Sequence, residues 1–131
     1  MKFTKEERSL CKQVAEKHRK EIEYGDWYID SRRKEGYQTR LCEYQGKQNF
    51  GKIYSEFTPL WTISDCLEFL RERAFYLEGL CQIDECEFQC AISEMDDMGV
   101  VKHSKKRFEG ESELEACLKA VLAVLEEKTN G

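Results

Sequence analysis

Residues 61–74, WTISDCLEFLRERA, carry the clearest local structural signal in the sequence and decide the fold. Thr62 and Asp65 have the spacing of a capping box, in which two side chains satisfy each other's backbone amides at a helix start. Trp61 and Cys66 lie on either side of the cap at the spacing of a hydrophobic staple. The pattern predicts a helix beginning at Thr62 with one apolar stripe. The stripe residues are Cys66, Leu67, Leu70 and Ala74.

Two further capping boxes predict helices near each end of the chain. Thr4 with Glu7 begins the first, which is expected to run towards Gly25, and Ser112 with Glu115 begins the last. The last helix is expected to fray from about residue 128. The apolar stripe of the first is Leu10, Cys11, Val14, Ala15, His18 and Ile22, and that of the last is Leu114, Cys117, Leu118, Val121, Leu122 and Leu125.

Between the helices the apolar pattern changes to a period of two, which is typical of strands. The central hairpin is expected to turn at Asp84 and Glu85 and to place Cys86, Phe88, Cys90 and Ile92 on one face. The expected strands are 26–30, 37–42, 52–57, 76–82, 86–93 and 99–103. The sequence therefore predicts an α+β fold, an antiparallel β-sheet packed with three α-helices in the order α-β-β-α-β-β-(β)-α. A length of 131 residues suits a single domain over residues 1–131.

Composition and charge narrow the classes of function. The chain has 21 basic and 26 acidic residues and a formal net charge of −5, so it is not an obvious nucleic-acid binder as a whole. Residues 1–20 are charged from the start and do not resemble a signal peptide. No run approaches the roughly 18 apolar residues of a membrane span. We therefore expect a cytoplasmic protein without a membrane partner.

The seven cysteines are odd in number, and without an export signal they are expected to be reduced and mostly buried. One alternative is a structural zinc site formed by Cys81, Cys86, Cys90 and His103. Zinc sites usually take their ligands from close pairs such as C-x₂-C. The spacings here are C-x₄-C and C-x₃-C, so burial is the favoured interpretation and no metal or cofactor is predicted.

No arrangement of residues indicates catalysis. The two histidines are His18, on a helical stripe, and His103, in a basic run, so a cysteine–histidine pair is not favoured. The acidic pairs lie in expected turns and helix ends, and the glycines lack a phosphate-binding pattern. The sequence therefore predicts no catalytic residue and no enzyme activity.

Basic loops offer a second alternative, a nucleic-acid-binding module. Phosphate contacts need exposed basic side chains, and the nearby aromatics Tyr37 and Phe108 could stack on bases. The candidate residues are Arg32, Arg33, Lys34, Lys105, Lys106 and Arg107. A separate route to a partner is self-association through Phe69, if that side chain points away from its helical stripe.

Residues 59–73, residues 109–125 and the triplet Gly25-Asp26-Trp27 together resemble small proteins encoded by phages and prophages, including a phage α/β/α sandwich domain. These segments are packing motifs, so the resemblance transfers no functional residue. The cysteine content and the long expected amino-terminal helix of this chain depart from the pattern of those proteins. The resemblance implies a small accessory or protein-interaction module of unassigned activity, with a protein partner or self-association.

Overall fold

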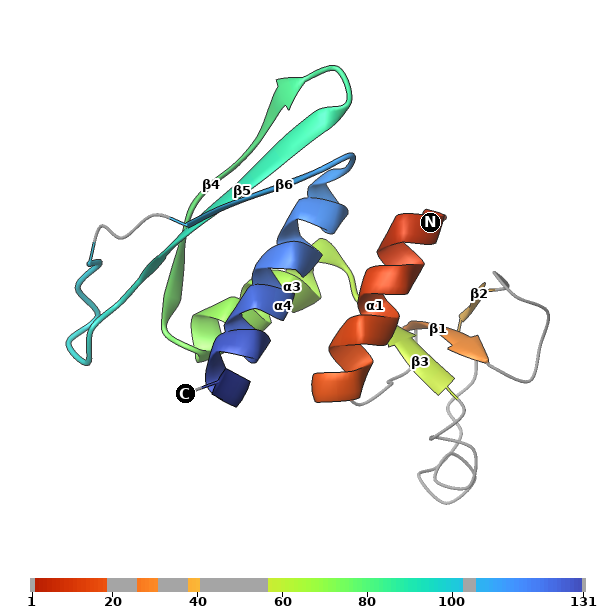
Figure 1. Ribbon diagram of the computed structural model, residues 1–131, viewed down its shortest axis with the longest axis horizontal. Coiled ribbons are helices and arrows are strands. Elements are labelled where there is room, and N and C mark those ends of the chain that lie inside the picture. Colours follow the sequence, from red (N-terminus) through yellow and green to blue (C-terminus); the bar gives the residue numbers. More distant parts are fainter. Residues whose placement is uncertain (1, 19–25, 31–37, 41–56, 103–105, 131) are drawn as a thin grey trace. The chain divides into compact units, whose positions relative to one another are not determined.

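The computed structural model describes residues 2–18, 26–30, 38–40, 57–102 and 106–130 (Figure 1). Contacts divide the chain into two compact units, Met1–Leu60 (unit 1) and Trp61–Gly131 (unit 2). The described residues combine helices with antiparallel sheets, which confirms the α+β class. Their strands form two three-stranded sheets rather than the one sheet expected. The single domain over residues 1–131 stays a prediction.

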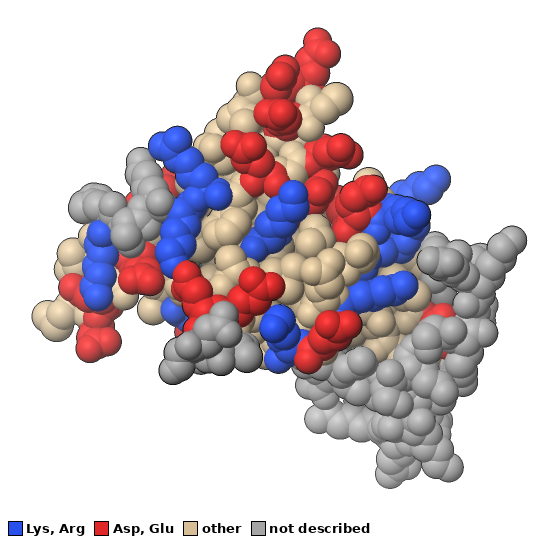
Figure 2. All heavy atoms as spheres, in the orientation of Figure 1, with Lys and Arg blue, Asp and Glu red and all other residues tan. Residues whose placement is uncertain are grey.

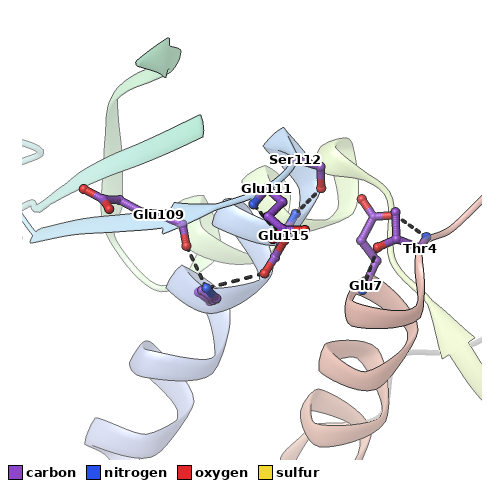
Figure 3. A network of polar contacts seen from close by, with 7 residues as sticks. Thr4, Glu7, Glu109, Glu111, Ser112 and Glu115 are labelled. Carbon is purple, nitrogen blue, oxygen red and sulfur yellow. Dashed lines mark hydrogen bonds and ion pairs between the residues drawn. The ribbon is translucent and has the colours of Figure 1, made fainter. Parts of the chain in front are cut away.

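Unit 1 begins with helix α1, Lys5–Lys17, at the predicted capping box. The Thr4 amide donates to Glu7 Oε1 at 2.7 Å, and the Glu7 amide donates to Thr4 Oγ1 at 3.1 Å (Figure 3). The helix ends at Lys17, because His18 takes an extended conformation as its C-cap. It therefore stops before the predicted end near Gly25, and residues 19–25 lie outside the described ranges.

The sheet of unit 1 has the strand order β2-β1-β3 and is antiparallel throughout. Its strands are β1 (Trp27–Asp30), β2 (Gln38–Arg40) and β3 (Phe57–Leu60). Tyr28 and Phe57 stack across β1 and β3 with ring centroids 4.3 Å apart. Pro59 lies within the edge strand β3, where a residue without an amide hydrogen is tolerated. Of the expected strand 52–57, only Phe57 lies in the described ranges.

Unit 2 packs two helices on one face of a second antiparallel sheet, ordered β4-β5-β6 (Figure 1). The strands are β4 (Phe75–Asp84), β5 (Glu87–Glu94) and β6 (Lys106–Gly110). The helices are α3 (Ile63–Glu72), which contacts β4, and α4 (Glu113–Asn130), which contacts β5 and β6.

Helix α3 begins as the sequence predicts. The Thr62 amide donates to Asp65 Oδ2 at 2.9 Å, and the Asp65 amide donates to Thr62 Oγ1 at 3.2 Å. Phe69 is buried, with its ring edge-on to Trp61 at 5.7 Å and the Arg73 guanidinium 4.7 Å from its centroid. The condition for self-association through an exposed Phe69 is therefore not met.

Helix α4 has a modified capping box. The Glu115 amide donates to Ser112 Oγ at 3.1 Å, as predicted, but the Glu115 carboxylate accepts from the Glu111 amide at 2.8 Å (Figure 3). All six predicted stripe residues are buried, and so are Ala116, Ala120 and Val124. The burial of α4 therefore extends well beyond one stripe.

The β4–β5 hairpin turns one residue later than expected, at Glu85 and Cys86. Cys86 is exposed in the turn, so its predicted place in a buried strand is wrong. The reason lies in β4, where register shifts leave Glu78 and Ile83 as extra residues without partners on β5. The expected strand 99–103 is also wrong for its described residues, which form an isolated bridge between Val101 and Met95.

Candidate interaction surface

The sheet of unit 2 has a helix face and an open face. Cys90 and Ile92 on β5 are fully buried, and α4 is the helix that contacts this strand. Successive strand residues point to opposite faces, so Ala91 and Ser93 lie on the other side. That side carries neither α3 nor α4, and we call it the open face, although Ser93 on it is buried (Figure 1).

Strand pairing identifies the residues of the open face, because directly opposed residues in an antiparallel sheet project to the same side. Its centre is made of small side chains, and Tyr76 beside them remains 49% exposed. The pairs on this face are Tyr76 with Ser93, Gly79 with Ala91, Cys81 with Gln89, Ala91 with Arg107 and Gln89 with Glu109.

A structured turn, residues 96–100, follows β5 at the end of the sheet where β4 begins. Asp96 Oδ1 accepts from the amides of Met98 and Val100 at 2.9 and 2.8 Å. The Asp96 amide donates to the Val100 carbonyl at 2.9 Å, and the Gly99 amide donates to the Asp96 carbonyl at 3.0 Å. Gly99 has a φ of +80°, which glycine adopts without a steric penalty. One carboxylate therefore fixes the conformation of the turn.

The turn presents apolar side chains to solvent. Met98 is 87% exposed and Val100 is 60% exposed. The described residues include two other exposed large hydrophobic side chains, Tyr76 near the start of β4 and Ile83 near its end. Tyr76, Met98 and Val100 thus lie at the same end of the sheet, and we call these three residues the apolar end.

Both outer strands of the sheet carry features that oppose pairing with another strand. The extra residues Glu78 and Ile83 interrupt the regular ladder of β4. On β6, Lys119 Nζ donates to the Glu109 carbonyl at 2.8 Å and lies 3.5 Å from Glu115 Oε1. Bulges and lysines are recognised means of preventing edge-to-edge association. The apolar end is therefore a better candidate for contacts than either edge.

Charged residues are unevenly distributed along unit 2. Residues 74–101 contain no lysine or arginine, and their seven acidic residues are Glu78, Asp84, Glu85, Glu87, Glu94, Asp96 and Asp97. Acidic side chains gather over the projecting end of the β4–β5 hairpin (Figure 2). Such a surface repels phosphate groups.

The candidate nucleic-acid residues do not form one basic loop where the structure describes them. Lys106 and Arg107 begin strand β6, so their expected position in a loop is wrong. Lys106 pairs with Ile92 on the helix face and forms an ion pair with Glu127, whereas Arg107 is exposed on the open face. Arg32, Arg33, Lys34 and Lys105 lie outside the described ranges, and nucleic-acid binding stays a prediction.

The candidate zinc ligands are also separated. Cys81 is exposed on the open face, Cys86 is exposed in the turn, and Cys90 is buried on the helix face. His103 lies outside the described ranges. Within those ranges, no three or more histidine, cysteine or acidic residues are grouped so that they could hold a metal ion. The sheet itself lies between Cys81 and Cys90, so these two thiols cannot bind one ion together.

The sequence interpretation placed Asp96 and Asp97 in a loop but did not assign the hydrogen bonds by which the Asp96 side chain closes the turn, although the signal for them was present. An aspartate followed three residues later by glycine is typical of a turn closed by the aspartate side chain.

None of the helices in the described part of the chain combines the length and apolar character needed to cross a bilayer. Comparison with known protein families, curated proteins and solved structures found no match.

Proposed function

We propose that this protein is a small cytoplasmic interaction module without catalytic activity, and that its apolar end binds a protein partner. The resemblance of residues 59–73 and 109–125 to phage and prophage proteins motivates the further proposal that it is an accessory protein of that origin.

One observation carries this proposal. Met98 and Val100 are held in solvent by a turn that a single aspartate fixes, at the end of the sheet that also exposes Tyr76. Single exposed apolar residues are common on monomeric proteins. The position of three such side chains at one end of the sheet, two of them on an ordered turn, is what supports a contact surface here.

The energetics favour such a surface. Burying one large apolar side chain contributes about 1.5–3 kcal/mol, so the apolar end can supply a useful part of a binding free energy. Because the turn is already ordered, binding loses less conformational entropy than it would with a flexible loop. The unbranched, polarisable side chain of Met98 adapts readily to an apolar pocket.

The test compares two variants of the full chain. Met98→Ser combined with Val100→Ser removes the apolar side chains of the turn, and Ile83→Ser removes an exposed apolar side chain at the other end of β4. Each protein is purified from cells that express it, and co-purifying proteins are quantified. Sedimentation of each protein alone measures self-association.

We expect a partner retained by the unchanged protein and by Ile83→Ser to be lost from the double variant by tenfold or more. Equal retention by all three proteins would contradict the proposal, and so would loss from Ile83→Ser alone. A two-subunit species that disappears only in the double variant would identify a second copy of the chain as the partner.

A further inference from the structure

The open face of unit 2 carries two neighbouring rows of residues that complement each other in size and charge. Each row crosses all three strands of the sheet, because it is made of residues that pair directly across β4, β5 and β6. The first row is Gly79, Ala91 and Arg107, and the second row is Cys81, Gln89 and Glu109. The first row therefore combines small residues with a positive charge, and the second combines larger residues with a negative charge.

The two rows are accessible to another molecule. Cys81, Arg107 and Glu109 are exposed, and a Cβ atom added at Gly79 would meet nothing within 4 Å. Ser93 in the neighbouring row is buried, so the accessible surface is centred on these two rows.

The two charges on β6 are available for an intermolecular contact. Arg107 and Glu109 project to the same side of the strand, two residues apart. Among the described residues, neither side chain forms an ion pair with the other or with a third group. The contact of Lys119 with Glu109 uses the backbone carbonyl and does not involve the carboxylate (Figure 3).

We propose that the open face binds the open face of a second copy of the chain in a symmetric dimer. In such a contact the same surface serves both copies, related by a two-fold axis. An axis that lies between the two rows, in the plane of the contact and perpendicular to the strands, places the first row of each copy on the second row of the other. Arg107 then faces Glu109 of the second copy, Ala91 faces Gln89, and Gly79 faces Cys81.

Size and charge both favour this arrangement. Sheets that pack face to face lie about 10 Å apart and interdigitate their side chains. The open space over Gly79 can therefore receive the Cys81 side chain of the second copy. Charge selects the direction of the axis, because an axis parallel to the strands and centred on β5 would place β6 on β4 and leave both charges of β6 unpaired.

The accessible area predicts a weak dimer. Two or three rows across strands about 4.8 Å apart present on the order of 300 Å² to a partner, whereas stable complexes bury roughly 800 Å² on each partner. The net charge of −5 on each copy also opposes association. We therefore expect the dimer to form in the micromolar to millimolar range of protein concentration.

Exchanging the charges tests the contact. Arg107→Glu and Glu109→Arg each place like charges opposite one another, so each should weaken the dimer tenfold or more. Sedimentation equilibrium of the full chain over this concentration range measures the change, with a reductant present to prevent disulfides between the exposed cysteines. An equal mixture of the two variants should associate more tightly than either alone, because every facing pair is again of opposite charge.

Two comparisons separate the facing pair from other effects. Arg71→Glu is the matched control, because Arg71 is exposed on α3, which covers the opposite face of the sheet, and its replacement should leave the dimer unchanged. Glu109→Arg reduces the net negative charge, which by itself would favour association, and yet it should weaken the dimer.

A monomer at every concentration would overturn the proposal, and so would single variants that associate as well as the unchanged protein. A mixture of the two variants that associates no better than either alone would also overturn it. This contact is separate from the apolar end, so the Met98→Ser and Val100→Ser double variant should still form the dimer. A dimer lost only in that double variant would place the contact between copies at the apolar end instead.

Discussion

At the scale of single residues, the absence of a side chain at Gly110 allows the end of β6 to pack closely against the first turn of α4. It ends β6 directly before the first turn of α4. A Cβ atom at this position would lie 2.8 Å from the Ala116 amide nitrogen and 2.8 Å from the Glu115 Cβ atom. Atoms of real side chains do not approach so closely, so strand or helix would have to move.

We predict that Gly110→Ala lowers the free energy of unfolding by about 1–3 kcal/mol, the usual range for an overpacked site. Denaturant unfolding of both proteins measures the change. Gly79→Ala is the control, since nothing lies within 4 Å of the added Cβ atom there, and its effect should stay within about 0.5 kcal/mol. Equal effects of the two substitutions would show that Gly110 is not closely packed.

Adjacent residues of the same charge have different surroundings. Lys106 and Arg107 are neighbours in the sequence, where they suggest one basic patch. The alternation of β6 sends Lys106 to the helix face, where it pairs with Glu127, and Arg107 to the open face. Charge runs therefore predict a patch only when the segment is known to be a loop.

At the scale of elements, the sequence predicted helix starts well and strand details poorly. The boxes at Thr4 and Thr62 depend on contacts three residues apart, which the sequence displays directly. The end of the hairpin depends on the extra residues Glu78 and Ile83, which a period of two cannot reveal. The burial of Cys90 depends on the packing of α4 against β5, which no local pattern encodes.

The turn at residues 96–100 provides a prediction at this scale. Asp96→Ala removes the acceptor of the Met98 and Val100 amides, so the turn should lose its fixed conformation. We expect faster hydrogen exchange at both amides, and a change in unfolding free energy below about 1 kcal/mol because these bonds are exposed. Asp97→Ala is the matched control. Unchanged exchange in Asp96→Ala would contradict the role given to this carboxylate.

At the scale of the whole molecule, acidic residues outnumber basic ones and the net charge is −5. We therefore predict that replacing Lys105, Lys106 and Arg107 with alanine leaves elution from heparin and from duplex DNA almost unchanged across a salt gradient. The control removes the same charge from α1 by replacing the exposed Lys5, Lys12 and Lys17. Salt-dependent retention that only the first variant loses would establish the nucleic-acid alternative instead.

The central claim is that the apolar end contacts a protein, and site-specific photocrosslinking tests it most directly. A photoreactive phenylalanine analogue is placed at Met98 in one protein and at Ile83 in another, and both are irradiated in cells. The account predicts a discrete cross-linked species from position 98 and none from position 83, with the mass of the product separating a second copy from a different partner. A discrete product from position 83 alone, or from neither position, would contradict it.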